Sequence, residues 1–188
     1  MLALPPMNAT SGSVPVTLVS HPQTSSRAVR GIDAVVTLAP GGILTLAFGL
    51  EGDLTLLHIP EPGPPRRTDG LWRHTCFEVF VMAEEGPGYR ELNLSPSGEW
   101  AAYVFRGYRD GAELAVERPP GLVVRRSVDR LELEAQICQD FLPPGRPLRI
   151  GLSAVVKDRD GVLSYWALRH PPGRPDFHHP DAFSLQPA

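Results

Sequence analysis

The sequence has little of what marks membrane or nucleic-acid-binding proteins. No apolar run approaches the ~20 residues that a membrane-spanning helix needs. The formal net charge is only −3, and no stretch gathers lysine and arginine into a basic stripe. Neither a membrane nor a nucleic acid is therefore an expected partner. The first residues lack the basic start and continuous apolar core of a signal peptide, so we expect a cytoplasmic location.

Cysteine is almost absent, with only Cys76 and Cys138 among 188 residues. Two cysteines cannot form a disulfide framework, and in a cytoplasmic protein both are expected to be reduced. A single bridge between them stays an alternative if the protein is exported.

Enzyme signatures are also missing. The chain contains no GxSxG, HExxH, P-loop or CxxC motif. Cys76 follows His74 by two residues, but such a pair shares one strand face without converging as nucleophile and base. Alternating strand–helix units are absent, which argues against a nucleotide-binding α/β fold. We therefore predict a protein that is not an enzyme and that needs no metal or cofactor.

The sequence is rich in proline and glycine, which separate short strand-like segments. The 21 prolines and 18 glycines are about a fifth of the chain. Strand-like segments recur between them at residues 14–20, 34–38, 41–50, 52–59, 74–82, 89–96, 99–105, 130–137, 147–156 and 163–170. Only residues 139–144 suggest a helical turn. The prediction is an all-β, two-sheet antiparallel β-sandwich of immunoglobulin-like or jelly-roll type, with a barrel as the other solution.

Two segments alternate clearly enough to assign faces. In "RLELEAQI", residues 131, 133, 135 and 137 are apolar and should face the core, while their neighbours face water. In "YRELNL", Arg90, Leu92 and Leu94 share one side, and Tyr89, Glu91 and Asn93 share the other. Residues 1–15 are expected to be a loose tail, and residues 16–188 a single domain.

The C-terminal segment "RHPPGRPDFHHPDAF" gathers possible metal ligands. They are His170, Asp176, His178, His179 and Asp181. This set could in principle hold zinc, but adjacent histidines of an extended chain point apart. Four prolines stiffen the segment, so we interpret it as a rigid loop laid across the end of the sandwich.

The three tryptophans differ in their neighbours. Trp100 stands among small and apolar residues and is assigned to packing. Trp72 and Trp166 have charged and polar residues nearby. A flat ring can cover the CH face of a sugar while charged side chains bond its hydroxyl groups. The alternative is that all three rings are core residues of an interaction domain without a small ligand.

Three segments carry a resemblance to a known family. "LWRHTCFEVFV", "YRELNLSPSGEWAAYVFRGY" and "YWALRHPPGRPDFHHPDAF" resemble the bacterial DOMON-like proteins, which are akin to family 9 carbohydrate-binding modules. The resemblance spans roughly Val16 to Leu185. It implies a β-sandwich with a pocket for a small-molecule ligand such as a saccharide, and it leaves any protein partner open.

The resemblance also implies site residues. In the sugar-binding relatives two tryptophans clamp a sugar while a glutamate and an arginine bind its hydroxyls. The W-x5-E pattern matches Trp72 and Glu78, the second tryptophan would be Trp166, and Arg90 would be the arginine. Other relatives bind haem through a methionine and a histidine. That cofactor is the alternative here, although no pair among Met82, His74 and His170 matches the pattern.

A straight strand sets a condition on this site. Six residues of strand span about 20 Å, too far for Trp72 and Glu78 to touch one small sugar. Trp72 must therefore lie in a loop that folds back over the strand, and Asp69-Gly70 supplies the turn. Phe77, Val79 and Val81 are then the core edge. Glu78 lies on the opposite edge, with His74 and Cys76 as lining or packing.

Overall fold

The structure is a computed structural model that describes residues 12–145 and 147–187. Within these residues it contains strands and short 3₁₀ turns (η1 to η4). The strands are β1 Ser13–Ser20, β2 Val29–Leu38, β3 Leu44–Gly52, β4 Cys76–Ala83, β5 Tyr89–Leu94, β6 Trp100–Gly107, β7 Asp110–Glu113, β8 Gly121–Arg126, β9 Arg130–Ile137, β10 Leu148–Lys157 and β11 Leu163–Ala167. No described helix is long and apolar enough to cross a membrane. The predicted all-β class is confirmed.

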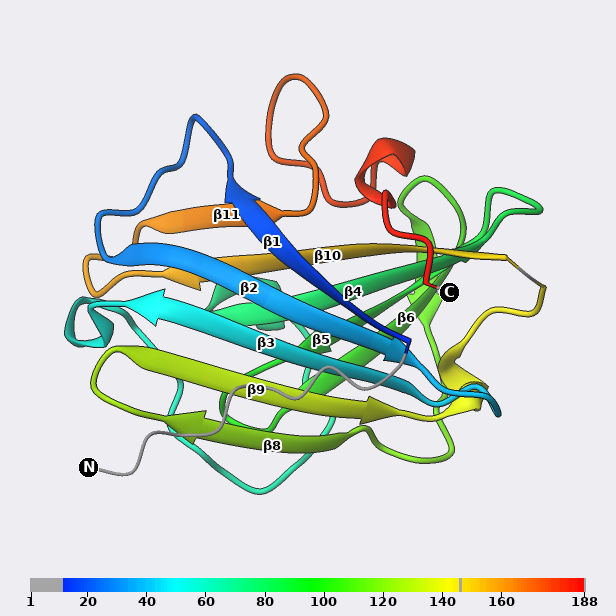
Figure 1. Cartoon of the computed structure of the whole chain (residues 1–188), viewed down its shortest axis with the longest axis horizontal. Coiled ribbons are helices and arrows are strands. Elements are labelled where there is room, and N and C mark those ends of the chain that lie inside the picture. Colours follow the sequence, from blue (N-terminus) through cyan, green and yellow to red (C-terminus); the bar gives the residue numbers. More distant parts are fainter. Residues whose placement is uncertain (1–11, 146, 188) are drawn as a thin grey trace.

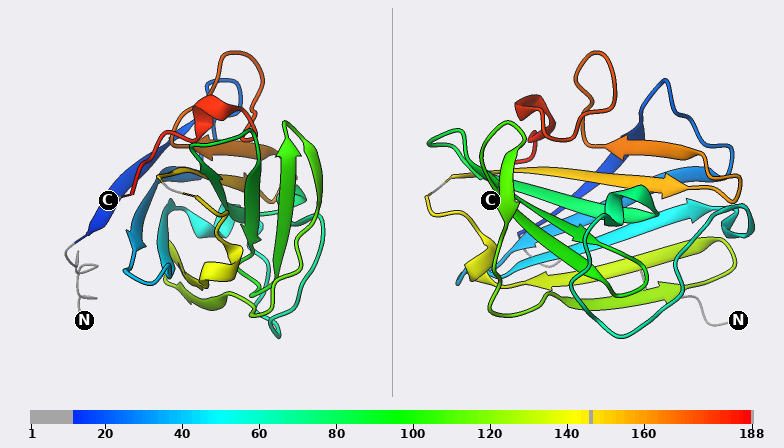
Figure 2. Two further views of the ribbon diagram at one scale, coloured as in Figure 1. Left: turned by 90° about the vertical axis from the view of Figure 1, so that its right-hand side faces the viewer. Right: turned by 180° about the vertical axis from the view of Figure 1, so that it is seen from behind.

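The strands form two layers that face each other (Figures 1 and 2). Sheet A has the order β1-β2-β3-β9-β8, and sheet B has the order β7-β6-β5-β4-β10-β11. Strand β1 belongs to both layers, because it pairs with β2 over most of its length and with β11 through Val19 and Ser20. One antiparallel 11-stranded sheet is thus folded over on itself. The predicted antiparallel sandwich is confirmed.

The core lies between the layers and follows the predicted alternation. In β9 the four apolar residues of "RLELEAQI" are all buried. In β4, Phe77, Val79 and Val81 join the same cluster, and the Phe77 ring lies 5.0 Å from the ring of Phe48 in β3. Burying each such side chain contributes about 1.5–3 kcal/mol. This packing fixes which side chains of sheet B face outward.

Two features of the strand prediction need correction. The strand predicted at 52–59 does not form beyond Gly52, the last residue of β3, because Asp53 accepts the backbone N–H of Thr55 at 3.0 Å and starts η1, Leu54–Leu56. An aspartate that caps a turn in this way diverts the backbone from a ladder. The edge strands β7 and β8 were also not predicted. Strand β7 is short and exposed throughout, so its sequence shows no alternation of buried and exposed residues.

The expected N-terminal tail is described only in part. Residues 1–11 lie outside the described residues. Strand β1 begins at Ser13, inside the segment 1–15 that was predicted to be a tail. The Ser13 and Thr37 hydroxyl oxygens lie 2.8 Å apart at that end of the β1–β2 pair.

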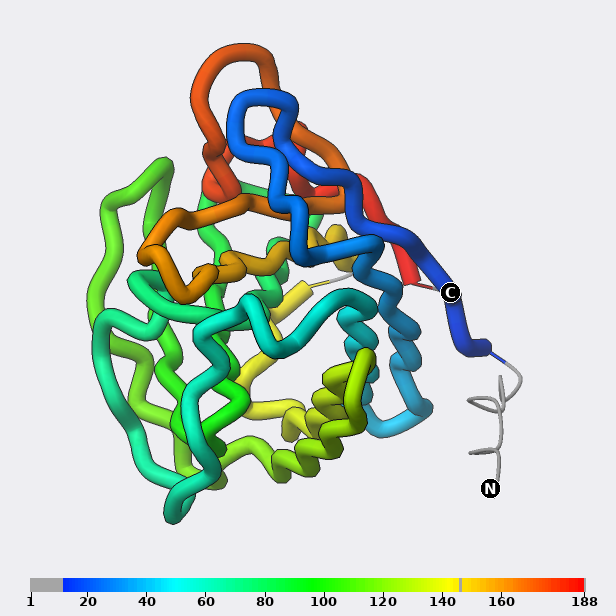
Figure 3. Tube along the Cα trace, turned by 90° about the vertical axis from the view of Figure 1, so that its left-hand side faces the viewer, coloured from blue at the N-terminus to red at the C-terminus, as the bar shows by residue number. Residues whose placement is uncertain are grey.

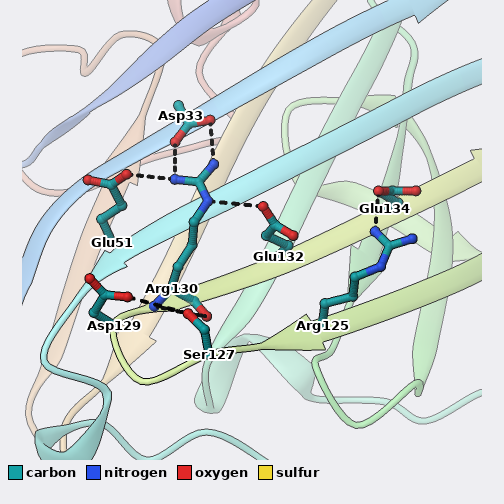
Figure 4. Close-up of polar contacts among 8 residues, drawn as sticks. All are labelled: Asp33, Glu51, Arg125, Ser127, Asp129, Arg130, Glu132 and Glu134. Carbon is teal, nitrogen blue, oxygen red and sulfur yellow. Dashed lines mark hydrogen bonds and ion pairs between the residues drawn. The ribbon is translucent and has the colours of Figure 1, made fainter. Parts of the chain in front are cut away.

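The outer face of sheet A is occupied by an ion-pair network (Figure 4). The Arg130 guanidinium makes two 3.2 Å contacts to the Asp33 carboxylate, and it also contacts Glu51 at 2.8 Å and Glu132 at 3.1 Å. Gly49 lies beneath it, where a Cβ would collide with the guanidinium. The outer face of sheet A thus presents side chains whose charges are paired with one another.

The C-terminal loop, residues 168–187, covers part of that outer face. Phe177 and Phe183 pack with Phe80 of β4 and Tyr89 of β5 in a second hydrophobic cluster. Figure 3 shows this loop beside the loop that connects β1 and β2. His170 Nε2 lies 2.9 Å from the Val19 carbonyl oxygen and ties the loop to β1. The segment is a covering loop as predicted, but it lies across the outer face of sheet B and not across the end of the sandwich.

Candidate functional site

A cavity of about 570 Å³ opens on the outer face of sheet B, and we call it the sheet B cavity. Its lining comes from five strands, the 3₁₀ turn η2 and three loops. The lining residues are Thr24, Trp72, Glu78, Glu91, Tyr103, Phe105, Arg109, Val155, Tyr165, Arg174, Pro175, Phe177 and His178. On each strand, the residues that line the cavity alternate with residues that point into the core. Strand alternation therefore creates the cavity's strand-derived lining.

Two buried carboxyl groups, Glu78 and Glu91, belong to the lining from β4 and β5. They are 3% and 5% exposed. Glu78 Oε2 accepts the Ser153 hydroxyl at 3.1 Å, and Glu91 Oε1 accepts the Asn93 amide N–H at 2.7 Å. Asn93 is also the cross-strand partner of Glu78, so the three side chains share one face. We call these three residues the acidic floor.

Burial makes both carboxyl groups hard to ionise. Loss of hydration raises the pKa of Glu91 to about 7. The same cause raises the pKa of Glu78 well above its ordinary value, and the nearby charge of Glu91 adds to the effect. The two groups are consequently not both ionised in the empty protein near neutral pH.

Aromatic rings form much of the cavity wall. Trp72 lies in η2, Leu71–Arg73, which starts at Gly70 with φ of +79°, a conformation that glycine adopts readily. Its ring meets Tyr103 edge-on at 5.9 Å, and the Tyr103 hydroxyl donates to Asp69 Oδ1 at 2.6 Å. The predicted Asp69-Gly70 turn that brings Trp72 back over the strand is thus confirmed, since Trp72 and Glu78 line one cavity.

The C-terminal loop is fastened to the turn between β6 and β7. Asp176 accepts hydrogen bonds from the Tyr108 hydroxyl at 2.8 Å and from Arg109 Nη2 at 2.9 Å. Among the residues that the structure describes, Arg109 is the one non-glycine residue with a positive φ, 56°. Its backbone N–H donates to the Tyr89 hydroxyl oxygen at 3.1 Å. This strained residue places a cation at the cavity.

His178 extends the same network towards the acidic floor. Its Nδ1 lies 2.9 Å from the Tyr89 hydroxyl oxygen, and its Nε2 lies 3.8 Å from Glu91 Oε2. Because the Tyr89 oxygen already accepts from Arg109, its own proton is free to point at Nδ1. Burial lowers the pKa of His178 to about 4, so the ring is neutral near neutral pH.

The structure separates the four residues that the sequence grouped as a ligand site. Trp72 and Glu78 line the cavity, but Trp166 is 7% exposed and belongs to the core between the sheets. Its Nε1 donates to the Ser164 hydroxyl at 3.1 Å. The prediction that Trp166 faces Trp72 across a cleft is therefore wrong. Tyr165, one residue earlier on β11, takes the outward position.

Arg90 is also misplaced for that site. It precedes Glu91 on β5 and therefore emerges on the opposite side of the strand. Its Nη1 donates to the carbonyl oxygens of Asp140 at 2.7 Å and Leu142 at 2.9 Å, which holds η3, Gln139–Phe141, against the sheet. The arginines that line the sheet B cavity are Arg109 and Arg174, and Arg109 is the one whose charge lowers the pKa of both glutamates.

The remaining candidate residues lie away from the cavity. Cys76 is buried against Leu71 and Ala101, and burial raises its pKa well above the ordinary value. Both cysteines are free thiols. His74 is exposed and lies near His58.

The part of the chain that the structure describes has no group of three or more His, Cys, Asp or Glu side chains that could hold a metal ion. Met82, His74 and His170, the candidate axial ligands for haem, do not line the sheet B cavity.

Most of the cavity was not identified from sequence. The alternation of "YRELNL" already placed Glu91 beside Asn93, but nothing local showed that this face would be covered. Arg109, Tyr165 and His178 come from a turn, a strand and a loop that only the fold brings together.

Comparison with known proteins gives the fold. No protein-family model and no curated protein sequence matches the chain. Among solved structures, a candidate carbohydrate-binding protein from Bacteroides uniformis superposes with a TM-score of 0.56 at 14% identity, covering 92% of this chain and 84% of that one. A family 9 carbohydrate-binding module from Caldicellulosiruptor kristjanssonii in complex with cellotriose gives 0.50 at 9% identity, covering 80% and 70%. The chain shares the β-sandwich of these carbohydrate-binding proteins.

Proposed function

We propose that the protein is a non-catalytic carbohydrate-binding domain that takes a small saccharide in the sheet B cavity. The observation that carries this is the pairing of aromatic walls with a polar floor in one cavity of about 570 Å³. Ring faces such as Trp72 and Tyr165 suit the CH face of a sugar, and Glu78, Glu91 and Arg109 suit its hydroxyl groups. The volume lies within the ~300–1,000 Å³ of ordinary small-molecule sites.

The fold likeness supports a saccharide over other small ligands. One structural neighbour is a candidate carbohydrate-binding protein, and the other was solved with cellotriose. We include in this proposal that the protein is a DOMON-like relative of family 9 carbohydrate-binding modules, as the sequence resemblance implies. The residues proposed to bind here are those of the sheet B cavity, with Trp72 and Glu78 retained from the sequence prediction.

Tryptophan fluorescence offers a direct test. Trp72 is 40% exposed, whereas Trp100 and Trp166 are 6% and 7% exposed, so a ligand in the cavity should alter the emission of Trp72. We expect one or more of glucose, glucosamine, cellobiose and cellotriose to change the spectrum and to release or absorb heat in calorimetry. The variant Trp72→Ala should lose most of the affinity.

A matched control is Leu56→Ala, which removes an exposed apolar side chain that does not line the cavity. It should bind as the wild type does. A flat response of the wild type to every sugar in the panel, by both methods, would reject the proposed function.

A further inference from the structure

The acidic floor of the sheet B cavity has an excess of hydrogen-bond acceptors. A carboxylate can accept at about four positions, yet within the described residues Glu78 and Glu91 each accept a single hydrogen bond. Asn93 Oδ1 is buried and has no hydrogen-bond partner. Such desolvated acceptors cost free energy unless a donor meets them. The floor is thus built to receive donors.

Among the described residues no lysine or arginine lies within ion-pair distance of this floor, although the charge of Arg109 lowers the pKa of both glutamates against the larger effect of burial. The basic side chain nearest to Glu91 is His178, 3.8 Å away, and its neutral ring offers one N–H at most. Arg109 is committed to Asp176 and Tyr108 at the edge of the C-terminal loop. Arg174 lines the cavity but is exposed to solvent. The position in direct hydrogen-bond contact with the two carboxyl groups is therefore left for the ligand.

The walls favour a cation as well. Trp72, Tyr103, Phe105, Tyr165 and Phe177 line the same cavity as the two glutamates. The faces of aromatic rings attract ammonium groups, most strongly where water is excluded. Carboxyl groups between aromatic rings are the combination that suits a primary ammonium group, which supplies a positive charge and three N–H donors.

We propose that the saccharide bound in the sheet B cavity is an amino sugar, with its ammonium group on Glu78 and Glu91 and its ring against the aromatic walls. This inference rests on the proposed function. It adds the charge of the ligand, which a general carbohydrate-binding role does not specify.

Binding of an ammonium group should displace a proton from the floor. Burial raises the pKa of Glu91 to about 7 in the empty protein, so the pair holds a proton at pH 6.5. The ionisable groups around the pair are Cys76, Tyr89, Tyr103, Arg109, Arg174 and His178, with Asp176 beyond His178, and the two arginines keep their charge. A cation at the floor stabilises the ionised carboxylates and releases the proton. A neutral sugar gives no such release.

Calorimetry with three related sugars tests the proposal at pH 6.5. Glucosamine, glucose and N-acetylglucosamine differ only at one substituent of the ring, which is an ammonium, a hydroxyl or an uncharged amide. We expect glucosamine to bind about tenfold or more tightly than either of the others, the equivalent of one charge-assisted hydrogen bond. Titrations in two buffers of different ionisation enthalpy should show proton release with glucosamine alone.

Variants connect the preference to the acidic floor. Glu91→Gln keeps the shape and the bond to Asn93 but removes the charge, and it should reduce the preference for glucosamine to below about threefold and decrease proton release. Glu132→Gln, on the outer face of sheet A, is the matched control and should leave both unchanged. If Glu91→Gln does not fold, the comparison of the three sugars on the wild type still decides.

The outcomes separate the two proposals. Glucose binding as tightly as glucosamine would overturn the amino-sugar inference and leave the carbohydrate-binding function standing. Binding of none of the three sugars, nor of any neutral saccharide in the panel, would overturn both. A glucosamine preference that survives in Glu91→Gln would also overturn the inference, because the acidic floor would not be its cause.

Discussion

At the scale of residues, neighbours on one strand have opposite roles. Tyr165 faces the sheet B cavity and Trp166 faces the core, and Glu91 faces the cavity while Arg90 does not. A strand turns successive side chains to opposite faces, so an error of one position exchanges a ligand contact for a core residue.

This difference predicts that Trp166→Ala damages stability and Trp72→Ala damages binding. Removing the buried indole of Trp166 should lower the free energy of unfolding by about 3–5 kcal/mol, because it leaves a cavity between the sheets. Removing the half-exposed ring of Trp72 should cost about 1 kcal/mol or less. Urea denaturation of both variants measures the two values, and equal losses would contradict the assignment.

Glu91 predicts a particular dependence of stability on pH. Its pKa rises from an ordinary 4.5 to about 7 on folding, mainly because the carboxyl is buried. The folded state therefore holds a proton that the unfolded state loses, and this contribution to stability is full below about pH 4.5 and is lost as pH rises through about 7. His178, whose pKa falls on folding, acts in the opposite direction between its two values.

The variant Glu91→Gln isolates that contribution. Compared with the wild type without ligand, the variant should gain stability as pH is raised from 5 to 8, since it has no carboxylate to bury in ionised form. Thermal denaturation of the two proteins across this range provides the measurement. A difference between them that is constant with pH would show that Glu91 titrates normally.

At the scale of elements, the outer face of sheet A depends on a pairing of glycine and arginine. Gly49 of β3 has no Cβ, and the guanidinium of Arg130 from β9 occupies the space beside it to reach Asp33 (Figure 4). A Cβ at position 49 would also lie 2.9 Å from Asp33 Oδ1. The glycine is therefore required by the ion-pair network.

We expect Gly49→Ala to destabilise the protein by about 1 kcal/mol, because the guanidinium must leave its position against Asp33. In an Arg130→Ala background the same change should be neutral or stabilising by about 0.4–1 kcal/mol, as alanine restricts the unfolded chain. A double-mutant cycle in urea measures the coupling. Additive effects would show that the two residues act independently.

At the scale of the whole molecule, the two layers share one core. Side chains from sheet A and sheet B belong to a single buried cluster, and β1 pairs with a strand of each layer. Neither layer can bury its apolar face without the other. We therefore expect residues 16–188 to fold as one domain, as the sequence predicted.

A single domain of this kind should unfold in one cooperative step. Tryptophan fluorescence and far-UV circular dichroism should give coincident urea transitions. Leu18→Ala, which removes a buried side chain of β1, should shift both transitions together by the same amount. Two separated transitions in either protein would contradict a single folding unit.

The sequence by itself determined the class of fold and the direction of many side chains. Alternation in β9 and β5 and the Asp69-Gly70 turn before Trp72 are local signals that act over a few residues. The pairing of Trp72 and Glu78 was implied by the family resemblance together with this turn, and both residues line one cavity. The exposed edge strand β7 escaped prediction because its pairing depends on β6 and not on its own pattern.

Only the tertiary structure decided which face of sheet B is a binding surface. Glu91, Arg109, Tyr165 and His178 are distant in sequence, and they meet because the C-terminal loop lies across the outer face of sheet B. Alternation along a strand predicts that a side chain points away from the core, but it does not predict whether water or another segment of the chain covers that side chain. The burial that raises the pKa of Glu91, and that left Trp166 in the core, is a property of the assembled fold.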